Sequence, residues 1–154
     1  MSIASKRSRA VFQKLDQDLV ELSSKPRAEH VHRFRTGTRR LQILLGELSP
    51  KLDRNEKKLL KLLVRIRKRA GKVRDLDVQL AALRSLKIPQ EPRRKTQLVH
   101  RLIELRSQQE KKLKKAVDED SVREIRKRLK RAAKNLDPQA GRDPSSSPVT
   151  IGIR

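Results

Sequence analysis

Apolar residues recur at intervals of three and four along most of the chain, which is the period of an amphipathic helix. The first such stripe runs from Phe12 to Leu22, inside a helix predicted over residues 3–23. Prolines and serines separate the stripes, since neither residue favours a helix interior. The other helices are predicted over residues 26–48, 54–86 and 93–136, the last with a break near Asp120.

Two of the predicted helix starts have the residues of a capping box, a short polar side chain followed three residues later by Glu. Asp53 with Glu56 forms one, and Ser121 with Glu124 forms the other. Gly71 lies inside the third helix and weakens it by about 1 kcal/mol relative to Ala. Close packing of a neighbouring helix is one reason for a glycine at this position.

These patterns predict an all-α protein, an antiparallel bundle of four to five helices joined by short loops. One helical domain covers residues 1–136, a length that suits a single core. From residue 137 to residue 154 the apolar stripe is lost and Pro, Ser and Gly dominate. We therefore expect a disordered tail there.

The chain is strongly basic, with 41 Lys and Arg against 18 Asp and Glu and a formal charge of +23. All of this excess lies in residues 1–136, because the two Arg and two Asp of the tail cancel. Such a charge indicates a polyanionic partner, which would be a nucleic acid, an anionic membrane or an inorganic polyanion. Phe12 and Phe34 are the only aromatic residues, so the platforms on which nucleic-acid bases usually stack are missing.

Several kinds of protein are disfavoured by what the sequence lacks. There is no cysteine, so disulfides and thiol chemistry are excluded, and nothing completes a transition-metal site with the three histidines. No apolar run approaches the roughly 20 residues that cross a bilayer, and no secretory signal follows the basic N-terminus. No activated nucleophile and no glycine-rich phosphate loop is visible. We therefore expect a binding protein and not an enzyme, with no cofactor and no metal, in the cytoplasm.

Residues 29–41 combine cations in an unusual register. On a helix at about 100° per residue, His32, Arg35 and Arg39 fall within about 60° of one another, opposite the apolar stripe, with Arg40 beside them. Such a ladder of donors suits phosphate oxygens, although a solvated basic face is the plainer interpretation. A second basic ladder follows in the third helix: Lys57, Lys61, Arg65, Lys68 and Lys72.

Two motifs make the chain resemble the CHAD family, the conserved histidine α-helical domain. They are His32-x-x-Arg35-x-x-x-Arg39-Arg40-Leu41 and Ala70-Gly71-x-x-Arg74-Asp75-Leu76-Asp77-Val78, in the family's order. Gln42 and Ala70 stand where the family often has a basic residue and a Leu. The resemblance covers residues 1–136 and implies helical bundles with a basic groove that binds inorganic polyphosphate. Full family members have two such helical halves, and this chain has room for one.

On this resemblance we predict that the protein binds polyphosphate through its basic helix faces. The predicted binding residues are His32, Arg35, Arg39, Arg40, Arg65, Lys68 and Lys72, with Arg9 and Arg101 as outer members. A helical protein that binds the backbone of DNA or RNA is the alternative.

Arg74-Asp75-x-Asp77 could supply two carboxylates for Mg²⁺, but helical phase separates them. Asp77 lies near the apolar stripe, where an unpaired carboxylate is costly. We therefore expect Asp77 to pair with an Arg or His of another helix.

The resemblance also implies a mode of assembly. A single helical half leaves one side of a basic groove open, and two copies about a two-fold axis would close it. Because +23 per chain opposes this contact, we expect a homodimer that a long polyanion favours. Polyphosphate granules are the expected site within the cytoplasm.

Overall fold

A computed structural model describes residues 3–48, 52–87 and 92–136. Every regular element in these ranges is an α-helix, which confirms the predicted fold class. The five helices are α1 (Ile3–Ser24), α2 (Ala28–Leu48), α3 (Arg54–Ser85), α4 (Pro92–Ala116) and α5 (Glu119–Leu136). The predicted tail, residues 137–154, lies outside the described ranges.

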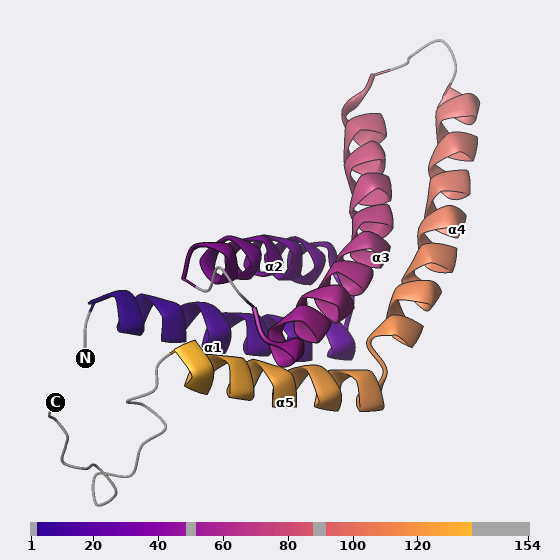
Figure 1. Cartoon of the computed structure of the whole chain (residues 1–154). Coiled ribbons are helices and arrows are strands. Elements are labelled where there is room, and N and C mark those ends of the chain that lie inside the picture. Colours follow the sequence, from indigo (N-terminus) through magenta and orange to yellow (C-terminus); the bar gives the residue numbers. More distant parts are fainter. Residues whose placement is uncertain (1–2, 49–51, 88–91, 137–154) are drawn as a thin grey trace, which may run out of the picture.

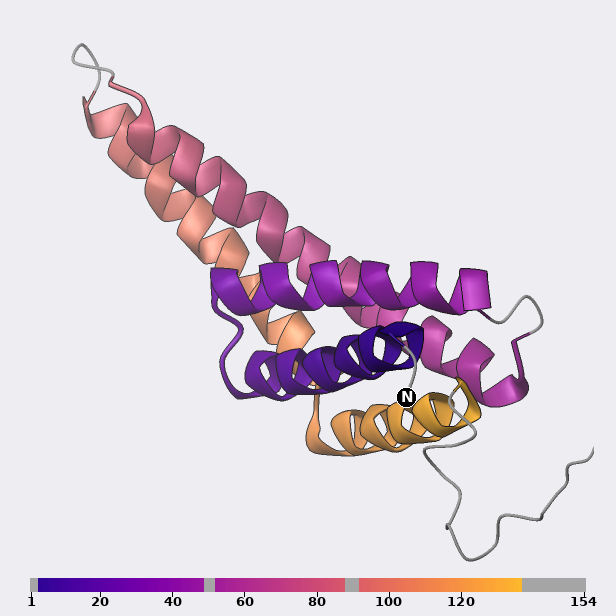
Figure 2. The same ribbon diagram turned by 90° about the vertical axis from the view of Figure 1, so that its left-hand side faces the viewer.

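The helices form a body and a projecting arm (Figures 1 and 2). In the body, α2 lies along one side of α1 and α5 along another, both antiparallel to α1, and the first half of α3 packs against α2 and α5. The second half of α3 and most of α4 leave the body as an antiparallel hairpin. We call this hairpin the arm and define it as residues 76–87 and 92–105. The arm is the main departure from the predicted simple bundle.

The core of the body is almost entirely aliphatic. It contains Phe12, Leu15, Leu19 and Leu22 of α1, Val31, Phe34, Leu41 and Leu45 of α2, Leu59, Leu63, Ile66, Ala70 and Val73 of α3, and Ile125, Leu129 and Ala132 of α5. From α4, by contrast, Leu113 is the one buried residue in the described part of the chain. The other leucines of its predicted stripe, Leu98, Leu102 and Leu105, lie on the arm and stay partly or largely exposed.

Aspartates cap α3 and α5. Asp53 Oδ1 accepts from the backbone N–H of Glu56 at 2.9 Å, as predicted. The cap of α5 is Asp118, whose Oδ1 accepts from the N–H of Ser121 at 2.8 Å and whose pKa this bond lowers. The predicted capping box at Ser121 is therefore wrong, because the helix already begins at Glu119.

The helix predicted over 93–136 is two helices, with the break at Val117 and Asp118. The chain turns there, and α5 returns along α1 (Figure 1). Arg126 Nε donates to Asp16 Oδ1 at 2.8 Å and joins α5 to α1. Asn55 Nδ2 donates to the carbonyl of Arg128 at 3.1 Å and joins α5 to the start of α3.

Arg106 of α4 links the arm to the body. Its Nε donates to Asp77 Oδ1 on α3 at 2.5 Å, its Nη1 to Glu110 Oε1 at 3.3 Å and its Nη2 to the Pro26 carbonyl at 3.1 Å. Burial opposes the charge of Arg106, but the hydrogen bond and the charge of Asp77 outweigh burial and raise its pKa. The predicted pairing of Asp77 with a cation of another helix is thereby confirmed. Pro26 itself lies in the link between helices, because α2 begins at Ala28 and not at Pro26.

Candidate anion-binding site

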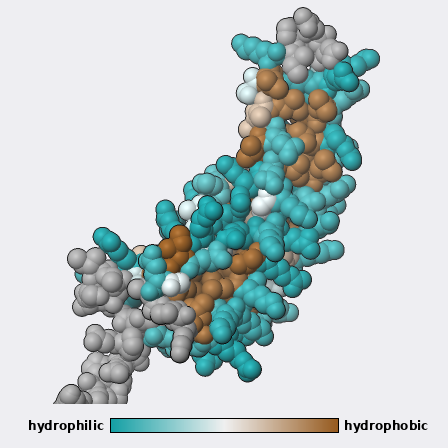
Figure 3. Space-filling model, turned by 45° about the horizontal axis from the view of Figure 1, so that its top comes forward, coloured by the Kyte–Doolittle hydropathy of each residue, from teal (hydrophilic) through white to brown (hydrophobic). Residues whose placement is uncertain are grey.

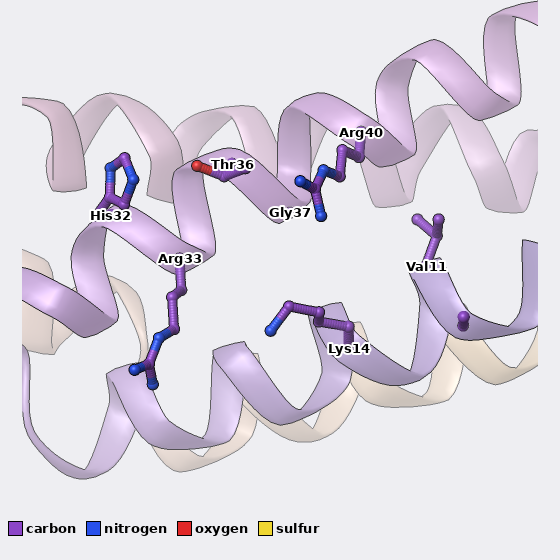
Figure 4. A pocket seen from close by; sticks show the side chains of 8 residues that line it. Val11, Lys14, His32, Arg33, Thr36, Gly37 and Arg40 are labelled. Carbon is purple, nitrogen blue, oxygen red and sulfur yellow. The ribbon is translucent and has the colours of Figure 1, made fainter. Parts of the chain in front are cut away.

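Helix α2 separates two hollows in the surface of the body. One lies between α2 and α3, measures about 350 Å³ and is lined by His32, Arg35, Thr36, Arg39 and Arg67. The other lies between α1 and α2, measures about 310 Å³ and is lined by Ala10, Val11, Lys14, His32, Arg33, Thr36, Gly37 and Arg40 (Figure 4). We call them the α2–α3 hollow and the α1–α2 hollow. His32 and Thr36 border both, so they form the ridge between them.

The α2–α3 hollow concentrates positive charge. Arg35, Arg39 and Arg67 line it, and no carboxylate of the described residues does. Within the described part of the chain, none of these three guanidinium groups has an ion-pair partner, and the buried Nε of Arg35 has no hydrogen-bond partner at all. A buried donor without a partner costs free energy unless a ligand or water satisfies it. An anion bound in the hollow could accept a hydrogen bond from this Nε.

Two uncharged residues position these arginines. Arg67 Nη1 donates to the side-chain oxygen of Gln42, which orients the α3 cation toward α2 without neutralising it. The guanidinium of Arg35 lies beside Gly71, where an added Cβ would be 3.9 Å from it. That distance is an ordinary van der Waals contact, so close helix packing does not explain Gly71. Gly71 instead forms part of the wall against which Arg35 lies.

In the α1–α2 hollow, carboxylates of α1 lie beside two of the cations. The side chains of Lys14, Arg33 and Arg40 project into the space between the two helices (Figure 4). Lys14 Nζ is 3.8 Å from Asp18 Oδ1, and Arg33 Nη1 is 3.5 Å from Glu21 Oε2. The pKa of Asp18 is raised, because the effect of burial is larger than the opposing effect of the Lys14 charge. This hollow therefore has less charge available for a ligand than the α2–α3 hollow.

The predicted binding residues are only partly brought together. His32, Arg35 and Arg39 line the α2–α3 hollow, while Arg40 lines the α1–α2 hollow. Arg65, Lys68 and Lys72 are exposed on α3, and Arg9 is exposed on α1, but none of them lines either hollow. Arg101 is exposed on the arm, 3.6 Å from Glu104.

Arg67 was missed in the sequence, although a signal for it exists. It lies four residues before Gly71 and thus on the same face of α3, about 100° from Lys68. The Lys57-to-Lys72 ladder lies on another face of α3 than Arg67, and a regular cationic row of this kind is equally suited to solvent. Thr36 and Lys14 were missed because neither stands out in sequence.

His30, the other histidine of α2, has a structural role in the described part of the chain. His30 Nδ1 donates to the Lys25 carbonyl at 2.6 Å, which holds the link between α1 and α2. No cluster of three His, Asp or Glu side chains suited to a metal ion occurs in the described residues. None of the described helices is long and apolar enough to cross a membrane.

Comparison with known proteins finds one family. The CHAD domain family matches residues 6–151, nearly the whole chain. No curated protein and no solved structure matches it.

Proposed function

The chain belongs to the CHAD family, and on that premise we propose that it binds inorganic polyphosphate in the α2–α3 hollow. CHAD domains are associated with polyphosphate-related proteins. The observation that carries the proposal is the hollow itself, in which Arg35, Arg39 and Arg67 meet and no described carboxylate is among the lining residues. Arg39 and His32 lie toward the exposed side of α2, where a chain longer than the hollow would continue.

Polyphosphate suits this site for a chemical reason. Each guanidinium presents a planar fork of donors that fits two oxygens of one phosphate or of adjacent phosphates. Polyphosphate offers such oxygens without intervening sugars or bases, so it needs neither base-reading side chains nor stacking platforms. Phe12 and Phe34 are the only Phe, Tyr or Trp residues and both are buried, so the described part of the chain offers no such side chain on its surface for a base to stack on. Backbone binding of DNA or RNA remains the second candidate, favoured by the charge of +23.

We propose binding without catalysis, by the monomer or by a homodimer that a long polyanion favours. Binding of this kind needs only the preformed donors of the hollow and no reacting group. A protein of this kind would act in the cytoplasm, at polyphosphate granules, and a fluorescent fusion imaged with a polyphosphate stain tests that placement.

We predict that polyphosphate displaces duplex DNA from the protein at about 0.2 M salt, near physiological ionic strength. Both affinities fall as salt rises, because binding releases counterions. Competition between labelled long-chain polyphosphate and unlabelled DNA or RNA of equal total charge shows which polyanion binds more tightly. If either nucleic acid binds more tightly, the backbone-binding alternative replaces this proposal.

We also predict that polyphosphate binding strengthens as pH falls from about 7.5 to 5.5, the range in which His usually titrates. A phosphate chain beside His32 favours the charged imidazole, so binding takes up a proton. His32→Gln should flatten this dependence and leave the affinity at the upper pH nearly unchanged. His100→Gln on the arm is the matched control and should behave like the wild type. An unchanged pH profile in His32→Gln removes His32 from the site.

A further inference from the structure

The face of α3 that packs on α2 continues onto the arm, where no other described helix covers it. Arg67 and Gly71 mark this face, since one bonds Gln42 of α2 and the other lies against Arg35. Steps of three and four residues carry the same row through the half-buried Arg74 and then past α2 to Val78, Ala81 and Ser85. Val78 is 49% exposed, and Ala81 and Ser85 are exposed as well.

Helix α4 adds apolar residues on the same side. The Asp77–Arg106 bond fixes which faces of α3 and α4 meet. Val78 lies about 100° onward from Asp77, and Ile103 lies about 60° onward from Arg106. Because the two helices are antiparallel, offsets of the same sign fall on the same side of the hairpin. Ile103 is 43% exposed there, and Val99 is half-buried beside it.

We call this side of the arm the inner flank and define it by Val78, Ala81, Ser85, Val99 and Ile103. Apolar surface is also visible along the arm in Figure 3. A two-helix layer cannot bury both of its sides, and helical hairpins usually gain stability from a further layer. Among the described residues, the inner flank is therefore an unpartnered surface that continues directly from the interface between α2 and α3.

The charge of the chain indicates which partner fits. Six basic and three acidic residues lie between 76 and 105, so this fifth of the chain contributes only +3 of the total +23. The five residues that define the inner flank are uncharged, and the exposed His100, about 120° onward from Arg106, lies at its edge. The opposite flank, with Leu98, carries Arg94 and Arg101. An acidic partner would bind more strongly to the basic body. Two copies of this chain, in contrast, repel one another least at the inner flank.

We propose that two copies associate through their inner flanks, so that the two arms form a four-helix bundle with two-fold symmetry. A two-fold contact uses one patch twice, so an uncharged apolar patch complements itself. Alanine and serine at positions 81 and 85 leave room for helices to approach closely. Since the inner flank continues the row of Arg67 and Gly71, the contact also brings the two α2–α3 hollows toward each other. That consequence rests on the proposed function, but the dimer itself does not.

The size of the flank sets the strength of the contact. A stretch of 14 helical residues is about 21 Å long and two packed helices are about 20 Å wide, which gives on the order of 400 Å² per copy. That is about half of a standard interface, so we expect a weak dimer with a dissociation constant on the order of 100 µM. Salt should strengthen it by screening the two basic bodies. Polyphosphate binding has the opposite salt dependence.

Sedimentation equilibrium of the full chain without polyphosphate tests the proposal. Between about 10 µM and 1 mM protein at about 0.5 M salt, the average mass should rise from one chain toward two. Val78→Lys should abolish the rise. Leu98→Lys is the matched control, because Leu98 is also 49% exposed but lies on the opposite flank. Circular dichroism should show unchanged helicity in both variants.

Because the chain has no cysteine, disulfide formation between two copies through a single introduced cysteine provides a second test. Under mild oxidation, Ala81→Cys should form a disulfide-linked dimer, whereas Gln79→Cys, exposed on another face of α3, should not. A single-chain mass up to about 1 mM, or a dimer lost in Leu98→Lys and kept in Val78→Lys, overturns the proposal. Either result leaves the polyphosphate competition untouched, so the two failures are distinguishable.

Discussion

Replacing Arg35 and Arg39 together by Glu should weaken binding of long-chain polyphosphate by at least about 100-fold. A hydrogen bond to a charged group contributes about 1.5–3 kcal/mol, so two lost arginines remove about 3 kcal/mol or more, which corresponds to at least two decades in affinity. The new carboxylates add repulsion to that loss. Fluorescence anisotropy with labelled polyphosphate at fixed salt measures the change.

The double variant should remain folded, because both side chains point away from the apolar core. Lys130→Glu with Lys134→Glu is the matched control: the two lysines also lie four apart, are exposed on α5, and give the same change in net charge. We expect this control to lose less than about tenfold, through long-range electrostatics alone. Equal losses in the two variants would show that total charge binds the polyanion and that the α2–α3 hollow is not a site.

Arg106→Leu should lower the free energy of unfolding by about 3 kcal/mol, because it leaves Asp77 charged, mostly buried and without its partner. The change also deprives the Pro26 carbonyl of its donor. For a domain of this size, the melting temperature should fall by about 10 °C. Thermal unfolding followed by circular dichroism measures it.

A double variant distinguishes the loss of the Asp77–Arg106 ion pair from the cost of leaving Asp77 charged without a partner. Asp77→Leu combined with Arg106→Leu replaces the pair by apolar side chains and should recover most of the stability, because such replacements are often neutral. Arg101→Leu, in an exposed pair with Glu104, is the control and should change the melting temperature by less than about 2 °C. A double variant no more stable than Arg106→Leu alone would assign the loss to packing.

Much of the fold was predictable because helical periodicity is a local property. The stripe from Phe12 to Leu22 is buried as expected, and the Asp53 cap forms. The helix break predicted near Asp120 lies two to three residues earlier, at Val117 and Asp118. The sequence left this open, since Asp118 and Ser121 can both begin a helix. The pairing of Asp77 with Arg106 followed from the cost of an inward carboxylate, although its partner could not be named in advance.

The site was only half predictable, for a related reason. Helical phase places His32, Arg35 and Arg39 on one row, and that row does border a hollow. The residues of α3 that meet the row depend on the angle at which α2 crosses α3. Packing selects Arg67 and Gly71 there and leaves Lys68 and Lys72 exposed elsewhere.

The sequence by itself determined that the chain is helical, where its helices lie within a few residues, and that its excess of 23 positive charges lies in the helical part. Only the tertiary structure decided how that charge is distributed among sites. It sets Glu21 of α1 beside Arg33 of α2, while the arginines of the α2–α3 hollow receive no carboxylate from the described residues. It also carries the arm away from the body and leaves the inner flank open. Periodicity acts over one or two turns of a helix, whereas neutralisation and burial depend on neighbours that are distant in the chain.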